Sequence, residues 1–356
     1  MPTRLGMPER SPAVMVACGR FHSVVVTADG GVCTFGAGGD GRLGHGNEID
    51  QLKPARFDAD KFQGAHMVMA AAGASHSVAV SSQGHVFTFG HGANGRLGHK
   101  DLHDKLVPTK LQSFGTHRVV IVVAAGLAHT VAVTEDGELW AWGRGGDALL
   151  ALGDLVDHLT PVLVGGADVF GGSSVLMAAC GDVHTLALTV HGAVYSWGCG
   201  EHGILGHGDC HHRLLPTCIA PHLFEQSDKV VTVSAGETHS AAVTQDGRIF
   251  TWGRGETYKG SCVSAGLGHA DFENKLVPTP IAAHHMLGAR VGRCHSLPTQ
   301  HMLAFAMGTH IRLGNHCEFL DMPGDLVERL IAISASWPEG RAGELHGVVR
   351  LAGGFR

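Results

Sequence analysis

Short runs of alternating apolar and polar residues, joined by glycine-containing turns, recur along most of the chain. In the first clear example, Val24 and Val26 precede a turn at 29–31, and Val32 and Thr34 follow it. Alternation with a period of two on both sides of a glycine-containing turn is typical of a β-hairpin. A helix would instead place apolar residues three and four positions apart. The pattern therefore predicts an all-β protein.

Each hairpin belongs to a longer repeat of 53 to 55 residues. A copy begins with a small residue, Gly, two variable residues and His-Ser or His-Thr, and continues through an apolar run and a turn to an aromatic residue followed by Gly. The head histidines are His22, His76, His129, His184, His239 and, in a degraded sixth copy, His295. The closing glycines are Gly36, Gly90, Gly143, Gly198 and Gly253. A Leu-Gly pair and a proline follow in each of the five clear copies.

A repeat of this length holds three or four short strands and cannot bury both faces of its own sheet. Stacking successive sheets in a ring buries those faces and leaves no open end. We therefore predict a β-propeller with four-stranded antiparallel blades, most simply seven of them. Six repeats are recognisable, with heads near residues 17, 72, 124, 179, 234 and 290, and a degenerate one follows them.

The predicted organisation has three parts. Residues 1–13 form an N-terminal segment that closes the ring, 14–315 carry the propeller repeats, and 316–356 form a degenerate last repeat or a helical tail. The second reading of that tail rests on residues 323–335, where a proline precedes apolar residues at helical spacing. Six and seven blades both remain open at this point.

Composition and charge narrow the function. The chain has 52 glycines, which the turns of the repeat explain, and 26 Lys and Arg against 32 Asp and Glu. A net charge of −6 without a basic run argues against nucleic-acid binding by bulk charge. No apolar stretch is long enough to span a membrane, and the nine cysteines show no Cys-x-x-Cys spacing. We expect a monomeric protein of the cytoplasm, the nucleus or both.

The complete repeat has the head Ala-Gly-x-x-His-Ser/Thr, the middle Asp-Gly-x-x-x-x-Trp/Phe-Gly, and the tail Gly-x-x-Gly-x-Leu-Gly-His followed by Pro. It resembles the regulator of chromosome condensation repeat family, strongly over residues 14–282 and weakly over 289–315. The resemblance implies a seven-bladed propeller. It also implies one of several functions: nucleotide exchange on the Ran GTPase, chromatin docking, partner recognition in HERC-type ubiquitin ligases, or ultraviolet-B perception in plants.

Fold alone does not choose among these functions. Chromatin docking in the family uses basic extensions, and the plant photoreceptor carries Gly-Trp-Arg-His-Thr repeats; neither feature occurs in this sequence. The residues after the predicted propeller are too few for the catalytic domain of a HERC-type ligase. The exchange factor uses a projecting β-wedge, for which the sequence offers no recognisable motif. An adaptor surface is the function that remains.

Several motifs suggest chemistry when taken alone. Gly-x-Gly-x-x-Gly occurs three times, but each copy runs into a proline-bearing loop instead of opening a helix, so we interpret it as turns. A histidine that recurs in every repeat indicates a shared structural hydrogen bond, such as one from imidazole to the backbone of a neighbouring strand. The cluster from Glu201 to His212 holds several metal-ligand types without a ligand spacing, and we interpret it as a polar loop. Cys210 with His211, and Ser23 with His22, are only sequence neighbours.

The sequence therefore predicts no catalytic residue, no cofactor and no metal ion. It favours a non-enzymatic scaffold or adaptor that binds a protein partner through loops of the propeller face. A small GTPase or a component of the ubiquitin pathway is the expected class of partner, and guanine nucleotide exchange on a Ran-like or other small GTPase is the alternative function. The candidate contact residues are Arg42, Arg96, Arg144, Arg254, and Tyr258 and Lys259 within a nine-residue stretch, 257–265, that contains an insertion of seven residues in the fifth copy.

Overall fold

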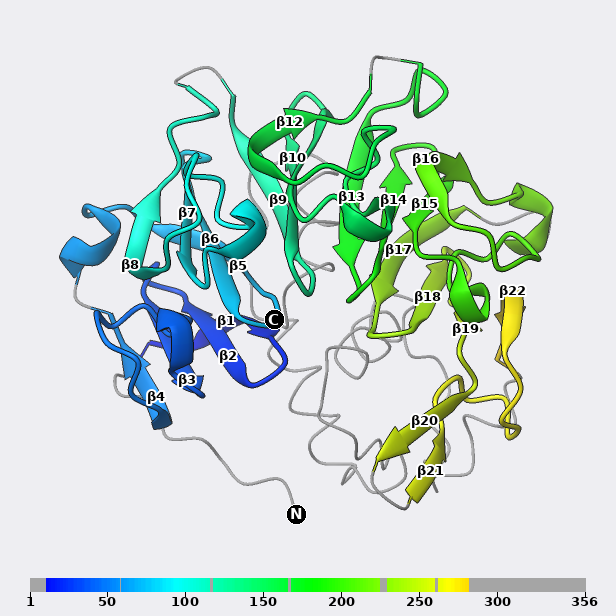
Figure 1. Ribbon diagram of the computed structural model, residues 1–356, viewed down its shortest axis with the longest axis horizontal. Coiled ribbons are helices and arrows are strands. Elements are labelled where there is room, and N and C mark those ends of the chain that lie inside the picture. Colours follow the sequence, from blue (N-terminus) through cyan, green and yellow to red (C-terminus); the bar gives the residue numbers. More distant parts are fainter. Residues whose placement is uncertain are drawn as a thin grey trace. The chain divides into compact units, whose positions relative to one another are not determined.

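The computed structural model describes residues 11–57, 59–115, 118–165, 168–224, 229–259 and 262–281, with the backbone alone for 257–259 and 262–265 (Figure 1). These residues divide into two compact units. The first contains the described residues of 11–146 and 154–165, and the second those of 147–153 and 168–281. The predicted ring-closing contacts of 1–10, the sixth repeat around His295 and the C-terminal repeat or helix lie outside the described residues.

The first unit contains three four-stranded antiparallel sheets, or blades, each formed by consecutive strands. They are β1 (Ala13–Cys18), β2 (His22–Thr27), β3 (Val32–Gly36) and β4 (Gln51–Arg56); β5 (Met67–Ala72), β6 (His76–Ser81), β7 (Val86–Gly90) and β8 (Lys105–Lys110); and β9 (Val120–Ala125), β10 (His129–Thr134), β11 (Leu139–Gly143) and β12 (His158–Leu163). Short 3₁₀ turns η1 (Gly39–Gly41), η2 (Ala59–Phe62) and η3 (Ala93–Gly95) connect them, and η4 (Gly146–Ala148) follows β11.

The second unit contains two further blades of the same topology and one separate hairpin. The blades are β13 (Val175–Cys180), β14 (His184–Thr189), β15 (Val194–Gly198) and β16 (Arg213–Cys218), and β17 (Val230–Ala235), β18 (His239–Thr244), β19 (Ile249–Gly253) and β22 (Lys275–Pro280). The turns are η5 (Glu201–Gly203) and η6 (Pro221–Phe224), and the hairpin is β20 (Glu256–Lys259) with β21 (Cys262–Ala265). Five four-stranded blades confirm the predicted all-β class and blade type.

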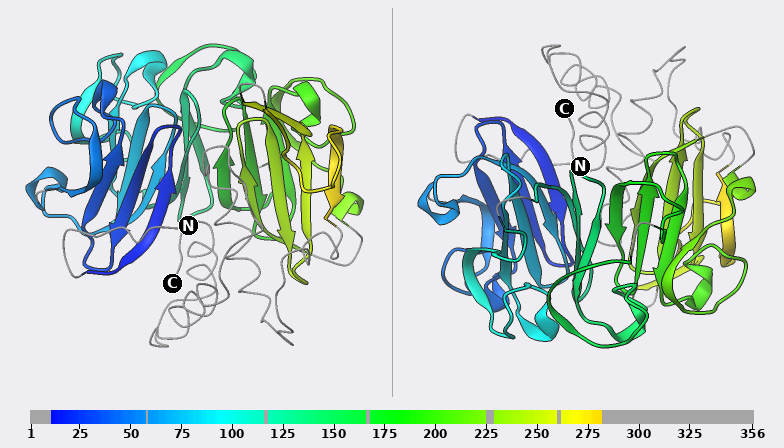
Figure 2. Two further views of the ribbon diagram at one scale, coloured as in Figure 1. Left: turned by 90° about the horizontal axis from the view of Figure 1, so that it is seen from below. Right: turned by 90° about the horizontal axis from the view of Figure 1, so that it is seen from above.

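Burial explains why the second strand of a blade is so apolar. All six residues of β6 are buried, although a strand in a sheet with one solvated face should alternate. Both faces of β6 are covered because its blade lies between two others of the first unit, with β5 packed against β1 and β9 (Figure 2). Aromatic rings complete this packing, since Phe57 of the first blade meets Phe89 of the second edge to face at a centroid distance of 5.7 Å.

The repeated glycines stand where a side chain has no room. Gly90 has φ +107° and pairs with His76 across the hairpin, and a Cβ there would lie 2.5 Å from the carbonyl oxygen of Ser75. The other four closing glycines share this conformation, with φ between 108° and 111°. The residue type that the sequence repeats at this position is therefore the one that the backbone requires.

The insertion in the fifth copy forms a two-stranded antiparallel sheet rather than an irregular loop. It pairs β20 with β21 in the register Glu256↔Ala265 to Lys259↔Cys262, and it joins none of the four strands of its blade. The amide of Gly266 donates to the carbonyl of Gly255 at 2.9 Å, which closes the base of the hairpin. A segment that the sequence shows only as an insertion thus has regular backbone structure.

The part of the chain that the structure describes includes no helix of the length and hydropathy needed to cross a membrane.

Candidate interaction face

The segment between the third and fourth strands of each blade forms one edge of that blade, and we call it the loop face. It begins at the closing glycine and ends at the fourth strand; it passes through a 3₁₀ turn in four blades and carries the hairpin β20–β21 in the fifth. In four blades the middle residue of the turn is left-handed, with φ between 58° and 61°. The residues there are Asp40, Asn94, Asp147 and His202. Asp, Asn and His are the side-chain-bearing residues that adopt this conformation most readily.

Two sets of side-chain hydrogen bonds hold each of these segments. An Asp or Asn four residues before the fourth strand accepts a hydrogen bond from the amide two residues later, as when Asp154 accepts from Val156 at 3.1 Å. A second Asx or His, just before the fourth strand, accepts the amide of the glycine two positions after the closing glycine, as when Asp157 accepts from Gly145 at 2.9 Å. The same pair of bonds occurs in all five described blades. The loop face is therefore fixed by bonds that the repeat supplies.

The head histidines join neighbouring blades within a unit. Nε2 of His22 lies 2.8 Å from Oγ of Ser77, and Nε2 of His76 lies 2.9 Å from Oγ1 of Thr130. Ser77 donates its own proton to the carbonyl of Arg42 at 2.8 Å, so the imidazole is the donor in the first bond. The partner is a side-chain hydroxyl, whereas the sequence analysis suggests a backbone group. His184 and Ser240 repeat the bond at 2.8 Å in the second unit.

A second histidine series stabilises the blade beneath the loop. In the second blade, Nε2 of His99 lies 2.8 Å from Oγ1 of Thr88, and that hydroxyl donates to the carbonyl of Leu97 at 2.7 Å. Burial lowers the pKa of His99. In the third blade both partners are apolar, because Ala141 and Leu152 occupy the equivalent positions. The pairs that share the polar arrangement are His45 with Thr34, His207 with Ser196 and His269 with Thr251.

The four candidate arginines occupy two different positions of the repeat. Arg42 and Arg96 follow the 3₁₀ turn and are only 9% and 7% exposed. The guanidinium of Arg42 donates to the carbonyls of Gly39 and Ala74 and to Asp40. Arg96 makes the equivalent bonds in the next blade. Both side chains connect a turn to the neighbouring blade, so little of either is open to a partner, and their role in binding stays a prediction.

The other candidate arginines stay at the surface. Arg144 and Arg254 directly follow closing glycines and are partly exposed in their own blades. Tyr258 and Lys259 lie on β20, where their backbones pair with Val263 and Cys262. The structure describes only the backbone of these two residues, so their role in binding stays a prediction.

Exposed apolar side chains are the feature of the loop face that the sequence analysis missed. Ile49 is 66% exposed, Leu102 56%, and Leu155 and Val156 60% each, all in the first unit. Each lies beside the Asx residues that fix its loop. In the second unit the equivalent position carries Phe272, which is 52% exposed. Large apolar residues at the two adjacent loop positions that follow the first Asx residue, present in four of the five described blades, are the signal that could have revealed them.

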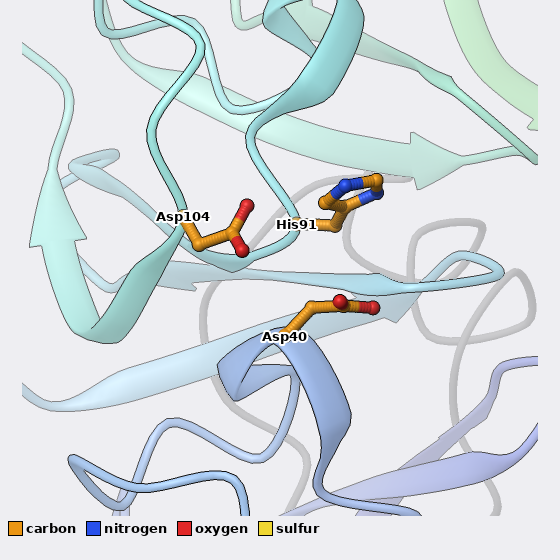
Figure 3. A group of neighbouring side chains, drawn as sticks. All are labelled: Asp40, His91 and Asp104. Carbon is orange, nitrogen blue, oxygen red and sulfur yellow. The ribbon is translucent and has the colours of Figure 1, made fainter.

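The predicted polar loop from Glu201 to His212 does not gather its side chains at one point. His207 is turned to Ser196, His212 accepts the amide of Gly200 at 3.0 Å, and Asp209 pairs with Arg213 at 2.7 Å. Within the described residues, three metal-ligand side chains come together elsewhere, namely Asp40, His91 and Asp104 (Figure 3). The sequence analysis missed this group because its members come from two repeats.

The two pairs of sequence neighbours, Ser23 with His22 and Cys210 with His211, do not form activated nucleophiles. His22 bonds to Ser77 rather than to Ser23, whose hydroxyl lies 3.9 Å from the sulfur of Cys18. Cys210 is exposed, and its neighbour His211 lies 3.5 Å from Asp209. Neither pair forms the nucleophile and base arrangement of covalent catalysis.

Repeated four-stranded blades with this loop chemistry define a β-propeller protein. The RCC1-like domain model matches residues 1–336, and the chain belongs to that family. The family resemblance noted in the sequence is thereby confirmed.

The known proteins that are similar to the chain include a plant receptor, a human ligase and a yeast chain in a solved complex. The ultraviolet-B receptor UVR8 of Arabidopsis thaliana is 40% identical over 255 residues, which are 71% of this chain and 56% of the receptor. The human E3 ubiquitin-protein ligase HERC2 is 35% identical over 241 residues, which are 67% of this chain and 5% of the ligase. The crystal structure of Kap60 bound to yeast RCC1 (Prp20) contains a similar chain, with a TM-score of 0.62, 26% identity, and coverage of 75% of this chain and 60% of that one. The chain thus spans just over half of one curated relative and a twentieth of the other.

Proposed function

We propose that this protein is a non-enzymatic interaction scaffold that binds a protein partner through its loop face. The observation that carries the proposal is the set of exposed apolar side chains on loops that are already fixed by hydrogen bonds. Leu155 and Val156 lie between Asp154 and Asp157, each of which holds a backbone amide. A loop fixed before binding loses little entropy when a partner docks, so its apolar area contributes more to affinity.

The charged neighbours of these residues suit a protein partner as well. Arg144 lies in the same segment as Leu155, and arginine beside apolar side chains is common at the energetically dominant positions of interfaces. Arg254 has the same position in its own blade, next to the hairpin β20–β21. Family membership supports the proposal, since yeast RCC1 is the partner of Kap60 in a solved complex.

A matched pair of substitutions in the third blade tests the proposal. Leu155 lies on the loop before β12, and Leu163 ends β12 with 36% exposure. Parallel affinity purification with Leu155→Asp, Leu163→Asp and the native chain should recover the same proteins with the native and Leu163→Asp baits. Leu155→Asp should lose at least one protein that then binds the native chain directly after purification. Equal recovery by all three baits would contradict a role of the loop face.

The hairpin β20–β21 favours guanine nucleotide exchange as the second candidate function. It is a two-stranded sheet separate from its blade, and the family's exchange factor acts on its GTPase with a projecting β-wedge. In this reading the hairpin enters the nucleotide site of a Ran-like or other small GTPase and displaces contacts to the phosphates. Nucleotide release from a panel of purified GTPases decides it: acceleration by the native chain and its loss on deletion of 257–265 would support exchange, and unaccelerated release would exclude it for that panel.

The remaining assignments follow from the scaffold proposal. We place the protein in the cytoplasm, the nucleus or both, as a monomer, with a small GTPase or a ubiquitin-pathway component as the partner class. Identification of the proteins lost with Leu155→Asp distinguishes the two classes. Light scattering of the purified chain measures its oligomeric state, and imaging of a tagged chain its location.

A further inference from the structure

Three equivalent positions of the repeat meet where two blades of the first unit adjoin. The first is the left-handed residue of a 3₁₀ turn; the second and third belong to the next blade, after its closing glycine and before its fourth strand. Between the second and third blades these positions hold Asn94, Arg144 and Asp157, and the amide of Asn94 donates to Asp157 at 2.8 Å. A direct donor and acceptor pair completes that junction.

The junction of the first and second blades has a different set of residues at these three positions. The corresponding residues are Asp40, His91 and Asp104, so two carboxylates stand where an amide and a carboxylate meet in the next junction. Two carboxylates without a proton between them offer only acceptors, so this junction lacks the direct donor and acceptor pair of the next one. Figure 3 shows Asp40 and His91 one above the other, with Asp104 beside them. One donor atom from each of the three side chains lies within 4.8 Å of the other two.

The protein fixes two of the three side chains. Asp104 accepts the amide of Gly92 at 2.7 Å through one oxygen, and Asp40 accepts from the guanidinium of Arg42 at 2.8 Å through Oδ2. Each carboxylate therefore keeps a second oxygen for another ligand. Among the described residues, the imidazole of His91 has no hydrogen-bond partner, although it is half-buried beside two acceptors.

We propose that Asp40, His91 and Asp104 bind one divalent transition-metal ion of the Zn²⁺ type at this junction. One imidazole nitrogen and two carboxylate oxygens are a ligand set that zinc accepts, with bonds of about 2.0–2.2 Å. Two donors on a tetrahedral zinc ion lie about 3.4 Å apart, so side-chain donors that now lie within 4.8 Å of one another must approach by up to about 1.4 Å. Rotation about the terminal torsions of Asp and His, which are soft, provides this movement.

Two neighbouring arginines lower the affinity of the site for a cation, but the site remains accessible from solvent. Arg42 occupies one oxygen of Asp40, and Arg96 is close enough to interact electrostatically with both Asp40 and Asp104. Asp104 is exposed and the other two ligands are half-buried, so an ion can enter from solvent. Three protein ligands leave at least one coordination position for water. We therefore expect micromolar binding of one ion per chain, independent of the scaffold function.

The other blades supply substitutions that the fold already tolerates. Asp40→Asn places in η1 the residue type that Asn94 provides in η3, and His91→Arg places in the second blade the residue type that Arg144 provides in the third. His103→Ala is the matched control, because His103 lies on the same loop as Asp104 with an 85% exposed side chain. Circular dichroism and thermal melting check that each variant is folded.

The experiment is titration of the tag-free, chelator-treated chain with Zn²⁺ by calorimetry, and with Co²⁺ by visible absorption as a second readout. The native chain and His103→Ala should bind one ion with the same affinity, whereas Asp40→Asn and His91→Arg should each weaken binding at least tenfold. Binding that no junction substitution changes would overturn the proposal, as would the absence of a micromolar site in the native chain. Loss in His91→Arg but not in Asp40→Asn would overturn the three-ligand assignment.

Discussion

Nε2 of His76 lies 2.9 Å from Oγ1 of Thr130, and this bond connects the second strands of two neighbouring blades. Thr130 in turn donates to the carbonyl of Arg96 at 2.8 Å. Both His76 and Thr130 are completely buried. The Thr130 hydroxyl therefore accepts a hydrogen bond from the imidazole N–H and donates one to a backbone carbonyl. The head histidine thus stabilises the stacking of blades rather than its own hairpin.

Thr130→Val should destabilise the protein by about 3 kcal/mol, because it leaves a buried donor and a buried acceptor without partners while preserving volume. Thr130→Ser keeps both bonds and should lose only about 1 kcal/mol, the cost of a methyl group. Urea unfolding measures both. Thr109→Val on the outer strand β8 is the control, since the Thr109 hydroxyl bonds only to a nearby carbonyl in an exposed setting, and its effect should stay within about 0.5 kcal/mol. Equal losses for Thr130→Val and Thr109→Val would contradict this role.

Stability should fall as the pH drops below about 6.5, the ordinary pKa of histidine. Burial lowers the pKa of His76, and burial also lowers the pKa of His99 and His207. The unfolded chain therefore binds protons in a range where the folded chain does not, so the stabilising contribution is complete above pH 6.5 and is lost below it. The carboxylate of Asp209, whose pKa is lowered to about 2 by the amide of His211 and then by Arg213, responds only at more acidic pH.

Urea unfolding between pH 8 and pH 5 checks this dependence. His76 alone should add a slope of up to about 1.4 kcal/mol per pH unit below 6.5. His76→Gln, which cannot be protonated, should be less stable at pH 8 but show a shallower dependence on pH. A slope that the substitution leaves unchanged would show that His76 is not held neutral.

Two glycine substitutions should separate steric exclusion from backbone strain. Gly90→Ala places a Cβ 2.5 Å from the carbonyl oxygen of Ser75 at φ +107°, and we expect a loss of more than about 3 kcal/mol. Gly64→Ala is the control at φ +74°, with no atom within 4 Å of the new Cβ, and should cost about 1 kcal/mol. Thermal or urea unfolding compares the two. A difference smaller than about 1 kcal/mol would contradict the close contact at Gly90.

Much of the fold could be predicted because each repeat has the same residue types at the same positions. The closing glycines, the hairpin turns and the head histidines recur at fixed spacing, and five four-stranded blades form from these repeats. The partners of these residues could not be predicted in the same way. Ser77, for example, is 55 residues from His22, and only the stacking of blades brings the two together.

The candidate site was harder to predict for the same reason. Arg42 and Arg96 look like surface residues in sequence, but the neighbouring blade supplies carbonyl acceptors that bury them. The group formed by Asp40, His91 and Asp104 draws on two repeats, so it has no sequence motif. The exposed residue Leu155 has an apolar type that sequence patterns assign to a core.

Site-specific photo-crosslinking in living cells tests most directly whether a partner binds through the loop face, because a crosslink forms only where the partner contacts the labelled position. A photoreactive phenylalanine analogue at Leu102 or Leu155 samples the loop face, and the same analogue at Leu163 samples the end of the outer strand β12. We predict that positions 102 and 155 crosslink to the same protein and that position 163 does not. Crosslinks from position 163 alone, or from none of the three positions, would contradict binding through the loop face.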